Sequence, residues 1–191
     1  MSGRLVIISA PSGAGKTTIV RHLLNCNLGL EFSVSATTRQ KRDNETDGRD
    51  YYFMSVEKFR EMIGKDGFVE WQEVYTDNFY GTPRSEIERI LSKGGNVLFD
   101  VDVMGGINLK NIFGSGAVSI FIMPPSIEEL GKRLTARGTD LPEKIRMRVI
   151  KAGEEIRHAG QFDFIVINDD LEKAKEESFR IVSDFIRGQV Q

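Results

Sequence analysis

The sequence predicts an α/β protein built on a parallel β-sheet with helices on both faces. Short apolar, β-branched runs alternate with longer helix-like stretches along most of the chain. This pattern is typical of parallel strands joined by helical crossovers. A glycine-rich turn joins the first such run to the first helix and so forms a βα unit. The 191 residues, of which 40% are hydrophobic and 28% are charged, are sufficient for one compact core.

The elements of this core are expected in a definite order. Residues 5–9 predict a short buried strand, and a helix follows over residues 15–25. Later strands are expected at residues 96–101, 117–123 and 164–167, and later helices at residues 126–137 and 171–186.

Two stretches interrupt the alternation. Residues 32–82 contain strand-like pieces at residues 32–36, 51–54 and 68–75 and one helix near residues 56–65. They predict a small mixed α+β insert. Residues 126–160 are helix-like apart from a turn at residues 137–140 followed by Pro142, which predicts a helical hairpin.

Positive charge gathers in this hairpin, although the whole chain has a net charge of −2. Residues 132–151 contain seven lysines and arginines against Asp140 and Glu143, a local net charge of +5. The seven are Lys132, Arg133, Arg137, Lys144, Arg146, Arg148 and Lys151. Because the chain as a whole is not basic, we expect no nucleic-acid or membrane partner, and any anion must be bound by a local arrangement.

The cysteine content and the lengths of the apolar runs indicate where in the cell the protein is found. Cys26 is the only cysteine, so it has no partner for an internal disulfide, and a reducing compartment is the simpler interpretation. No apolar run approaches the roughly 20 residues of a membrane span. We therefore expect a cytoplasmic protein, and the sequence is compatible with a monomer or a homo-oligomer.

The segment after the first strand resembles a Walker A phosphate-binding loop, although Ala10 replaces the motif's first glycine. Seven residues are predicted to bind the phosphates of ATP: Ser12, Gly13, Ala14, Gly15, Lys16, Thr17 and Thr18. Lys16 would reach the β- and γ-phosphates, and the Thr17 hydroxyl would bind Mg²⁺. A glycine-rich turn that only caps a helix is the alternative, but the Lys-Thr pair between a strand and a helix favours phosphate binding. The loop alone does not separate a GTPase or a motor from a small-molecule kinase.

Further motifs occur in order along nearly the whole chain. They are residues 32–42, residues 48–53, Glu70-Trp71, Tyr80-Gly81-Thr82, Asp100-Val101-Asp102, Pro124-Pro125-Ser126, Arg137-Gly138-Thr139 and residues 167–170. Together with the phosphate loop, they resemble the guanylate kinase family. The resemblance implies a P-loop nucleoside-monophosphate kinase fold with three parts. These are a P-loop core of residues 1–32, 83–125 and 161–191, a GMP-binding insert of residues 33–82, and a helical lid of residues 126–160.

The resemblance also implies a role for each residue of the insert motifs. Arg39, Arg42, Tyr51 and Tyr80 would hold the GMP phosphate, and Ser35, Glu70 and Thr82 would read the guanine. Guanidinium groups suit phosphate oxygens, and a carboxylate accepts hydrogen bonds from both N1–H and the 2-amino group of guanine. Taken singly, these residues would be explained equally well as solvated loop charges, a strand pair and a surface acid. Their order and spacing favour the site.

The remaining predicted site residues lie in the core and the lid. Asp100 and Asp102 would share one face if the strand extends that far. They would contact GMP, and Asp100 would orient Mg²⁺ through water. By resemblance, Arg133, Arg137 and Arg148 close over the triphosphate and, with Lys16 and Arg39, complete the catalytic set. The other lid cations, Lys132, Lys144, Arg146 and Lys151, are expected to be solvated. Asn168 is predicted to contact adenine, with turn formation in Asn-Asp-Asp as the competing interpretation.

The chain departs from the family pattern at a few positions. Lys41 stands where proline is common, Met104 stands where glutamine is usual, and the stretch between Glu70 and Tyr80 is one residue longer. Only the longer stretch would displace predicted site residues, namely Tyr80 and Thr82.

The resemblance implies transfer of the γ-phosphoryl group from ATP to GMP, with Mg²⁺ as cofactor and small molecules as the only substrates. Another P-loop phosphotransferase or GTPase would not need the arginine and tyrosine insert. A non-catalytic guanylate-kinase-like scaffold domain that binds phosphopeptides is the second alternative. Lys16, Thr17 and the lid arginines are all present, and they favour the enzyme.

Overall fold

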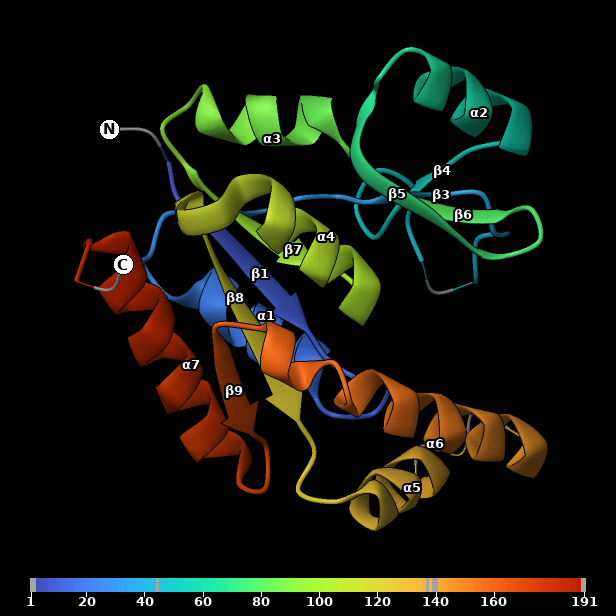
Figure 1. Ribbon diagram of the computed structural model, residues 1–191, viewed down its shortest axis with the longest axis vertical. Helices are drawn as coiled ribbons and strands as arrows, with labels where there is room; N and C mark the ends of the chain where they lie inside the picture. Colours follow the sequence, from blue (N-terminus) through green and yellow to red (C-terminus); the bar gives the residue numbers. More distant parts are fainter. Residues whose placement is uncertain (1–2, 44, 137, 139–140, 190–191) are drawn as a thin grey trace.

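The core of the molecule is a five-stranded parallel sheet. The computed structural model describes residues 3–43, 45–136, 138 and 141–189. The sheet contains β1 (Leu5–Ser9), β2 (Leu30–Phe32), β7 (Asn96–Asp100), β8 (Ala117–Met123) and β9 (Phe164–Ile167) in the order β2-β7-β1-β8-β9. Figure 1 shows the central strands side by side. The parallel α/β sheet predicted from the sequence is therefore confirmed.

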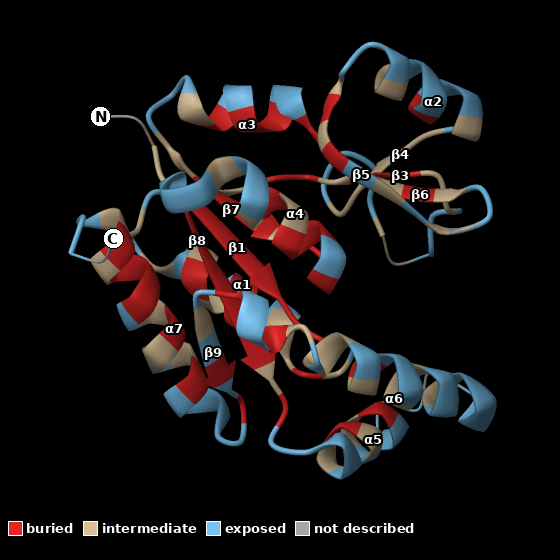
Figure 2. Ribbon diagram, viewed as in Figure 1, coloured by how far each residue is buried: buried red, intermediate tan, exposed pale blue. Residues whose placement is uncertain are grey.

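Alternate residues of the strands face two apolar clusters. Val6 and Ile8 pack against α1 (Lys16–Asn25) and α7 (Leu171–Ile186). Leu5 and Ile7 pack on the other side, against α3 (Arg84–Leu91) and α4 (Val103–Phe113). Because both faces are covered, β1 is buried along its whole length, as Figure 2 shows.

Two helices of the core, α3 and α4, were not predicted from the sequence. The α3 helix has eight residues, and α4 contains the adjacent glycines Gly105 and Gly106, which have low helix propensity. Packing on the sheet stabilises α4 because Val103, Ile107 and Leu109 are buried. Two short 3₁₀ turns, Gly114–Gly116 and Ala159–Gln161, precede β8 and β9.

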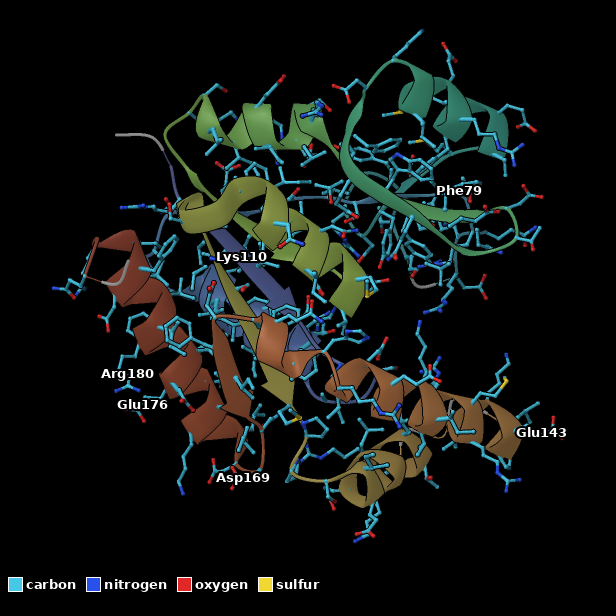
Figure 3. All side chains as sticks on the ribbon, in the orientation of Figure 1. Phe79, Lys110, Glu143, Asp169, Glu176 and Arg180 are labelled. Atoms are coloured by element: carbon cyan, nitrogen blue, oxygen red, sulfur yellow. The ribbon has the colours of Figure 1, made fainter. Side chains whose placement is uncertain are left out.

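A second, mixed sheet lies beside α3 (Figure 1). Its strands are β3 (Ala36–Thr37), β4 (Tyr52–Phe53), β5 (Phe68–Tyr75) and β6 (Asn78–Pro83), in the order β4-β3-β6-β5. The α2 helix (Val56–Gly64) covers it through Phe59, which stacks on Phe68 at 4.3 Å and on Phe79 at 5.3 Å between ring centroids. Figure 3 labels Phe79 in this small core. The sequence pattern predicted β5 and α2 but not β6.

The prediction of one strand at residues 32–36 is wrong. Phe32 ends β2 in the parallel sheet, and Ala36 begins β3 in the second sheet. Between them, the Ser33 N–H donates to Leu98 O, whereas the Val34 N–H donates to the buried carboxylate of Glu86 on α3. The pairing with β7 therefore ends at Ser33, and from Val34 onward the chain leaves the core sheet for the second sheet.

Two helices, α5 (Ile127–Ala136) and α6 (Pro142–Ile156), form a pair that projects from the core sheet (Figure 1). They pack through Leu130, Leu134 and Ala152. The predicted hairpin therefore has its two helices, while Arg137, Thr139 and Asp140 lie outside the described residues. No helix in the described ranges has both the length and the apolar character needed to cross a bilayer.

Candidate active site

The loop between β1 and α1 has the curled backbone that a phosphate site needs. Gly13 and Gly15 have φ angles of 100° and 98°, which favour glycine because they lie in the left-handed region. The Ala14 N–H donates to Pro11 O at 3.1 Å and closes the turn. Ala10, which replaces the motif's first glycine, is buried among the apolar residues under α1. The glycines required for the curl are therefore the two that this sequence retains.

Lys16 joins the loop to the end of β7. Its Nζ donates to Val101 O at 2.7 Å and lies 2.6 Å from Asp100 Oδ1. This ion pair is about four-fifths buried on both sides. The phosphate-loop lysine and the acidic strand end that the sequence predicted are thus in direct contact.

A central cavity of about 270 Å³ lies between the two sheets and α6. It brings together Lys16 and six of the residues predicted to bind GMP: Ser35, Tyr51, Glu70, Tyr80, Asp100 and Asp102. Gln72, Val74 and Lys151 also line it, and none of the three was predicted as a site residue. Gln72 and Val74 follow Glu70 at alternate positions of β5, which places them on the same face of the strand. Strand alternation was therefore the signal that could have found them.

Glu70 is a buried carboxylate in the wall of this cavity, with 8% of its surface exposed. Thr82 donates its hydroxyl to Glu70 Oε1 at 2.7 Å and is itself fully buried. Burial raises the pKa of Glu70 to about 7, and the nearby charge of Asp102 acts in the same direction. At neutral pH the group is therefore close to its point of half-ionisation.

The extra residue between Glu70 and Tyr80 does not displace the site. β5 and β6 pair with Glu70 opposite Thr82 and Gln72 opposite Tyr80. A register shift lies between Glu73 and Tyr75, near the turn, so the pairing at Glu70 and Gln72 is unaffected by it.

Arg39 is held by a carboxylate that the sequence analysis missed. Its two terminal nitrogens donate to Glu45 at 2.7 and 2.5 Å, and its guanidinium lies 4.9 Å from the ring centre of Tyr51. The Arg42 N–H donates to the same carboxylate at 2.9 Å, while the Arg42 side chain is exposed. The hydrogen bonds from Arg39 hold the pKa of Glu45 at about 2. Glu45 therefore stays ionised and fixes the side chain of Arg39 and the backbone of Arg42.

Asp102 reaches the cavity by a different route from the predicted one. β7 ends at Asp100, so strand alternation does not place the two aspartates on one face. Instead Asp102 caps α4, where Oδ1 accepts from the Gly105 N–H at 2.8 Å. Its other oxygen accepts a hydrogen bond from the side-chain amide of Gln72.

The chemistry of the site fits a magnesium ion bound largely through phosphate and water. Thr17 and Asp100 line one wall of a second cavity of about 700 Å³. Among the described residues, no three acidic, histidine or cysteine side chains gather closely enough to form a metal cage. Mg²⁺ usually retains several waters and needs only one or two protein oxygens beside the phosphates, which suits Thr17 and Asp100.

The helix pair contributes cations from α5 and α6. The Arg148 guanidinium lies 3.3 Å from Ser12 Oγ in the phosphate loop, and Arg133 pairs with Glu129 on its own helix at 3.4 Å. Arg137 lies outside the described residues. Lys151 is exposed, as expected, and it also lines the central cavity. Lys151 lies three residues after Arg148, on the same side of α6. This spacing could have predicted that Lys151 faces the site.

Asn168 is buried at the end of β9, with 4% of its surface exposed. Its Nδ2 donates to Ala14 O in the phosphate loop at 2.7 Å. This contact was not predicted from the sequence, and the predicted adenine contact stays a prediction.

Comparison with known proteins agrees with this geometry. The family model for guanylate kinase matches residues 2–185. The guanylate kinase of Bacteroides thetaiotaomicron is 51% identical over 186 residues, which cover 97% of this chain and 91% of that protein. The guanylate kinase of Porphyromonas gingivalis is 51% identical over 184 residues, which cover 96% and 98%. The crystal structure of guanylate kinase from Anaplasma phagocytophilum has a TM-score of 0.79 at 33% identity and covers 97% of this chain and 87% of that one. With this extent of agreement, the chain belongs to the guanylate kinase family.

Proposed function

We propose that this chain transfers the γ-phosphoryl group of ATP directly to GMP and gives ADP and GDP. One observation carries the proposal: Lys16 of the phosphate loop and the buried carboxylate of Glu70 line the same cavity. A donor phosphate and an acceptor nucleotide can therefore meet without leaving the protein. The acceptor phosphate oxygen is already nucleophilic at neutral pH, so no general base is needed. Catalysis rests on positioning and on charge neutralisation.

The donor site in this proposal is the phosphate loop with the helix pair. Residues 12–18 bind the phosphates of ATP, and Lys16 offsets the charge on the transferring group. Arg148 supports this role because it already lies beside Ser12. Arg133 and Arg137 complete the cationic set when residues 126–160 close as a lid. Thr17 and, through water, Asp100 would hold Mg²⁺, which neutralises phosphate charge when bound.

The acceptor site consists of residues from the insert and from the end of β7. Arg39, Arg42, Tyr51 and Tyr80 bind the GMP phosphate, with Asp100 and Asp102 at the other wall of the cavity. Ser35, Glu70 and Thr82 select guanine, with Thr82 acting through its hydrogen bond to Glu70. In this scheme residues 33–82 are the GMP-binding insert, and residues 1–32, 83–125 and 161–191 are the P-loop core.

The test of the function is ATP consumption with GMP, AMP, CMP and UMP in parallel. We expect rapid turnover with GMP only. A scaffold domain would show no turnover with any of the four and would bind a phosphopeptide instead. The proposal places the enzyme in the cytoplasm, where the single cysteine stays reduced.

We expect Glu45→Gln to raise the KM for GMP by about tenfold or more. The amide cannot accept the charge-assisted pair of hydrogen bonds that holds Arg39, and such bonds contribute about 1.5 to 3 kcal/mol. The KM for ATP should stay within about twofold of the parent value. Initial rates at varied GMP and ATP measure both constants.

Glu61→Gln is the matched control for Glu45→Gln. Glu61 also pairs with a cation of the insert, Lys65, but the pair is exposed to solvent. We expect its KM for GMP to match that of the parent. An unchanged or lower KM in Glu45→Gln would contradict the role of Glu45.

Trp71 should report movement of the insert through its fluorescence. Its side chain is 44% exposed and lines a separate cavity with Asn108, Asn111 and Ile112 of α4. Because α4 belongs to the core, any shift of the second sheet against the core changes the surroundings of the indole. We expect saturating GMP to change the emission and AMP at the same concentration to leave it unchanged. A constant emission with GMP would argue against closure of the insert.

A further inference from the structure

Asn168 connects the last strand of the parallel sheet to the phosphate loop. Its backbone N–H donates to Met123 O at 2.7 Å, which continues the pairing of β9 with β8 and fixes the position of the residue. From this position its side chain reaches Ala14, a loop residue 154 positions earlier in the chain. The contact is therefore set by the fold and not by local sequence.

The hydrogen bond is made in a buried environment. Asn168 is 4% exposed and Ala14 is fully buried, and the distance from Nδ2 to Ala14 O is 2.7 Å. Only the nitrogen of the amide can donate to a carbonyl, so this contact fixes the orientation of the side chain. A buried carbonyl that loses its donor is costly, so the contact strongly restrains the loop.

Holding the carbonyl of Ala14 also sets the direction of the next N–H. In a trans peptide the C=O and the following N–H point in opposite directions. The peptide between Ala14 and Gly15 therefore turns its carbonyl to Asn168 and its N–H away from Asn168. Backbone N–H groups of this loop are the donors for phosphate, so their direction decides how well an anion is bound.

Gly15 packs directly against the same amide. A Cβ atom built on Gly15 would lie 2.2 Å from Asn168 Nδ2, far inside contact distance. The side chain of Asn168 thus fills the space beside Gly15, the residue that precedes Lys16. Asn168 touches the loop at two consecutive residues.

We propose that Asn168 is a positioning residue that holds the phosphate loop in its anion-binding conformation, independently of the base of the donor nucleotide. The inference rests on the proposed function in that the donor binds through this loop. It differs from the predicted adenine contact because it requires an effect on phosphate binding even when no base is present.

The experiment compares Asn168→Ala and Asn168→Asp with the parent protein in calorimetric binding of ADP and of inorganic tripolyphosphate, both with Mg²⁺. The aspartate has the shape of asparagine but cannot donate to Ala14 O when ionised. We expect both variants to bind both probes about tenfold to hundredfold more weakly, the range for loss of a buried partner. The KM for GMP should stay within about twofold.

Asp169→Asn is the matched control in the adjacent position. Asp169 is exposed on the turn between β9 and α7, where Figure 3 labels it, and its carboxylate accepts a hydrogen bond from the neighbouring Asp170 N–H. We expect its affinity for both probes to equal that of the parent.

Three results would overturn the proposal. Loss of ADP affinity with unchanged tripolyphosphate affinity would assign Asn168 to the adenine. Parent-like binding by Asn168→Asp would show that shape alone matters. Failure of tripolyphosphate to bind the parent would contradict a preformed phosphate site. Failure of the proposed function would appear separately, as a parent protein that binds both probes and has no turnover with GMP.

Discussion

Lys16→Ala is expected to lower turnover with GMP by at least about 10³-fold while leaving the fold intact. The ammonium group offsets charge on the transferring phosphoryl group, and removal of such a group typically costs two to five powers of ten in rate. Its ion pair with Asp100 is about four-fifths buried, and removing one partner of a buried pair typically costs about 3 kcal/mol or more. The Tm should therefore fall by about 6 to 12 °C, with unfolding still cooperative. Turnover and thermal unfolding measured on the same preparation check both parts.

Lys144→Ala provides the comparison for Lys16→Ala. Lys144 is exposed in the first turn of α6 and lines neither the central nor the second cavity. We expect its turnover to match the parent. If Lys16→Ala retained near-parent turnover, the assignment of the loop to ATP would fail.

Glu70 is expected to produce the second large effect, a preference for GMP over AMP of roughly 10⁴ to 10⁵ in kcat/KM. Its carboxylate accepts from guanine N1–H and the 2-amino group, whereas adenine N1 offers no donor. IMP should be intermediate, because it keeps N1–H and lacks the 2-amino group. Glu70→Gln should lower kcat/KM for GMP by at least about tenfold and affect IMP less. Equal kcat/KM values for GMP in the two proteins would show that Glu70 does not contact the guanine.

The raised pKa of Glu70 adds a pH dependence to this prediction. The carboxylate must be ionised to accept both hydrogen bonds, and its pKa in the free protein is about 7. The kcat/KM for GMP should therefore fall about tenfold per pH unit below pH 7 and level off above it. Glu70→Gln should lose this limb of the profile. A limb that persists in the variant would assign the titration to another group.

The same pKa predicts that Glu70→Gln stabilises the protein at high pH. The folded state holds the proton of Glu70 more tightly than the unfolded chain, where the pKa is about 4.5. The stability gained from this protonation is fully present below pH 4.5 and is lost as the pH rises through 7. At pH 8 the charged carboxylate costs at most about 3 kcal/mol, which the neutral amide avoids. Denaturant unfolding at pH 5 and pH 8 should show the two proteins converging at the lower pH.

The sequence predicts an element or a site residue well when the evidence for it lies in neighbouring residues of the chain. Apolar, β-branched runs in the sequence predicted four of the five strands of the core sheet. The phosphate loop followed from its glycines and the Lys-Thr pair. The α4 helix was missed because its stability comes from packing against β1 and β8, and its glycines oppose it locally.

The unpredicted parts of the site are contacts between distant or ambiguous residues. Nothing near Glu45 distinguishes it from the other acids of residues 43–50, because its meaning depends on the position of Arg39. Asn168 lies in a turn-forming Asn-Asp-Asp sequence, and only the completed sheet brings it to Ala14. Lys151 is exposed like other cations on α6, and the sequence alone does not show that it also lines the central cavity. In each case the missing information is the tertiary arrangement.

The crossing of the chain between the two sheets has a mechanical consequence. The outward crossing at residues 33–35 and the return at Pro83 both lie beside the first turn of α3, where Glu86 accepts hydrogen bonds from the Val34 N–H and the Tyr52 hydroxyl. The second sheet is therefore joined to the core by two chain connections that lie next to each other, beside α3. A rotation of the second sheet about these connections would change the contacts of β5 with α4, including the hydrogen bond from Gln72 to Asp102.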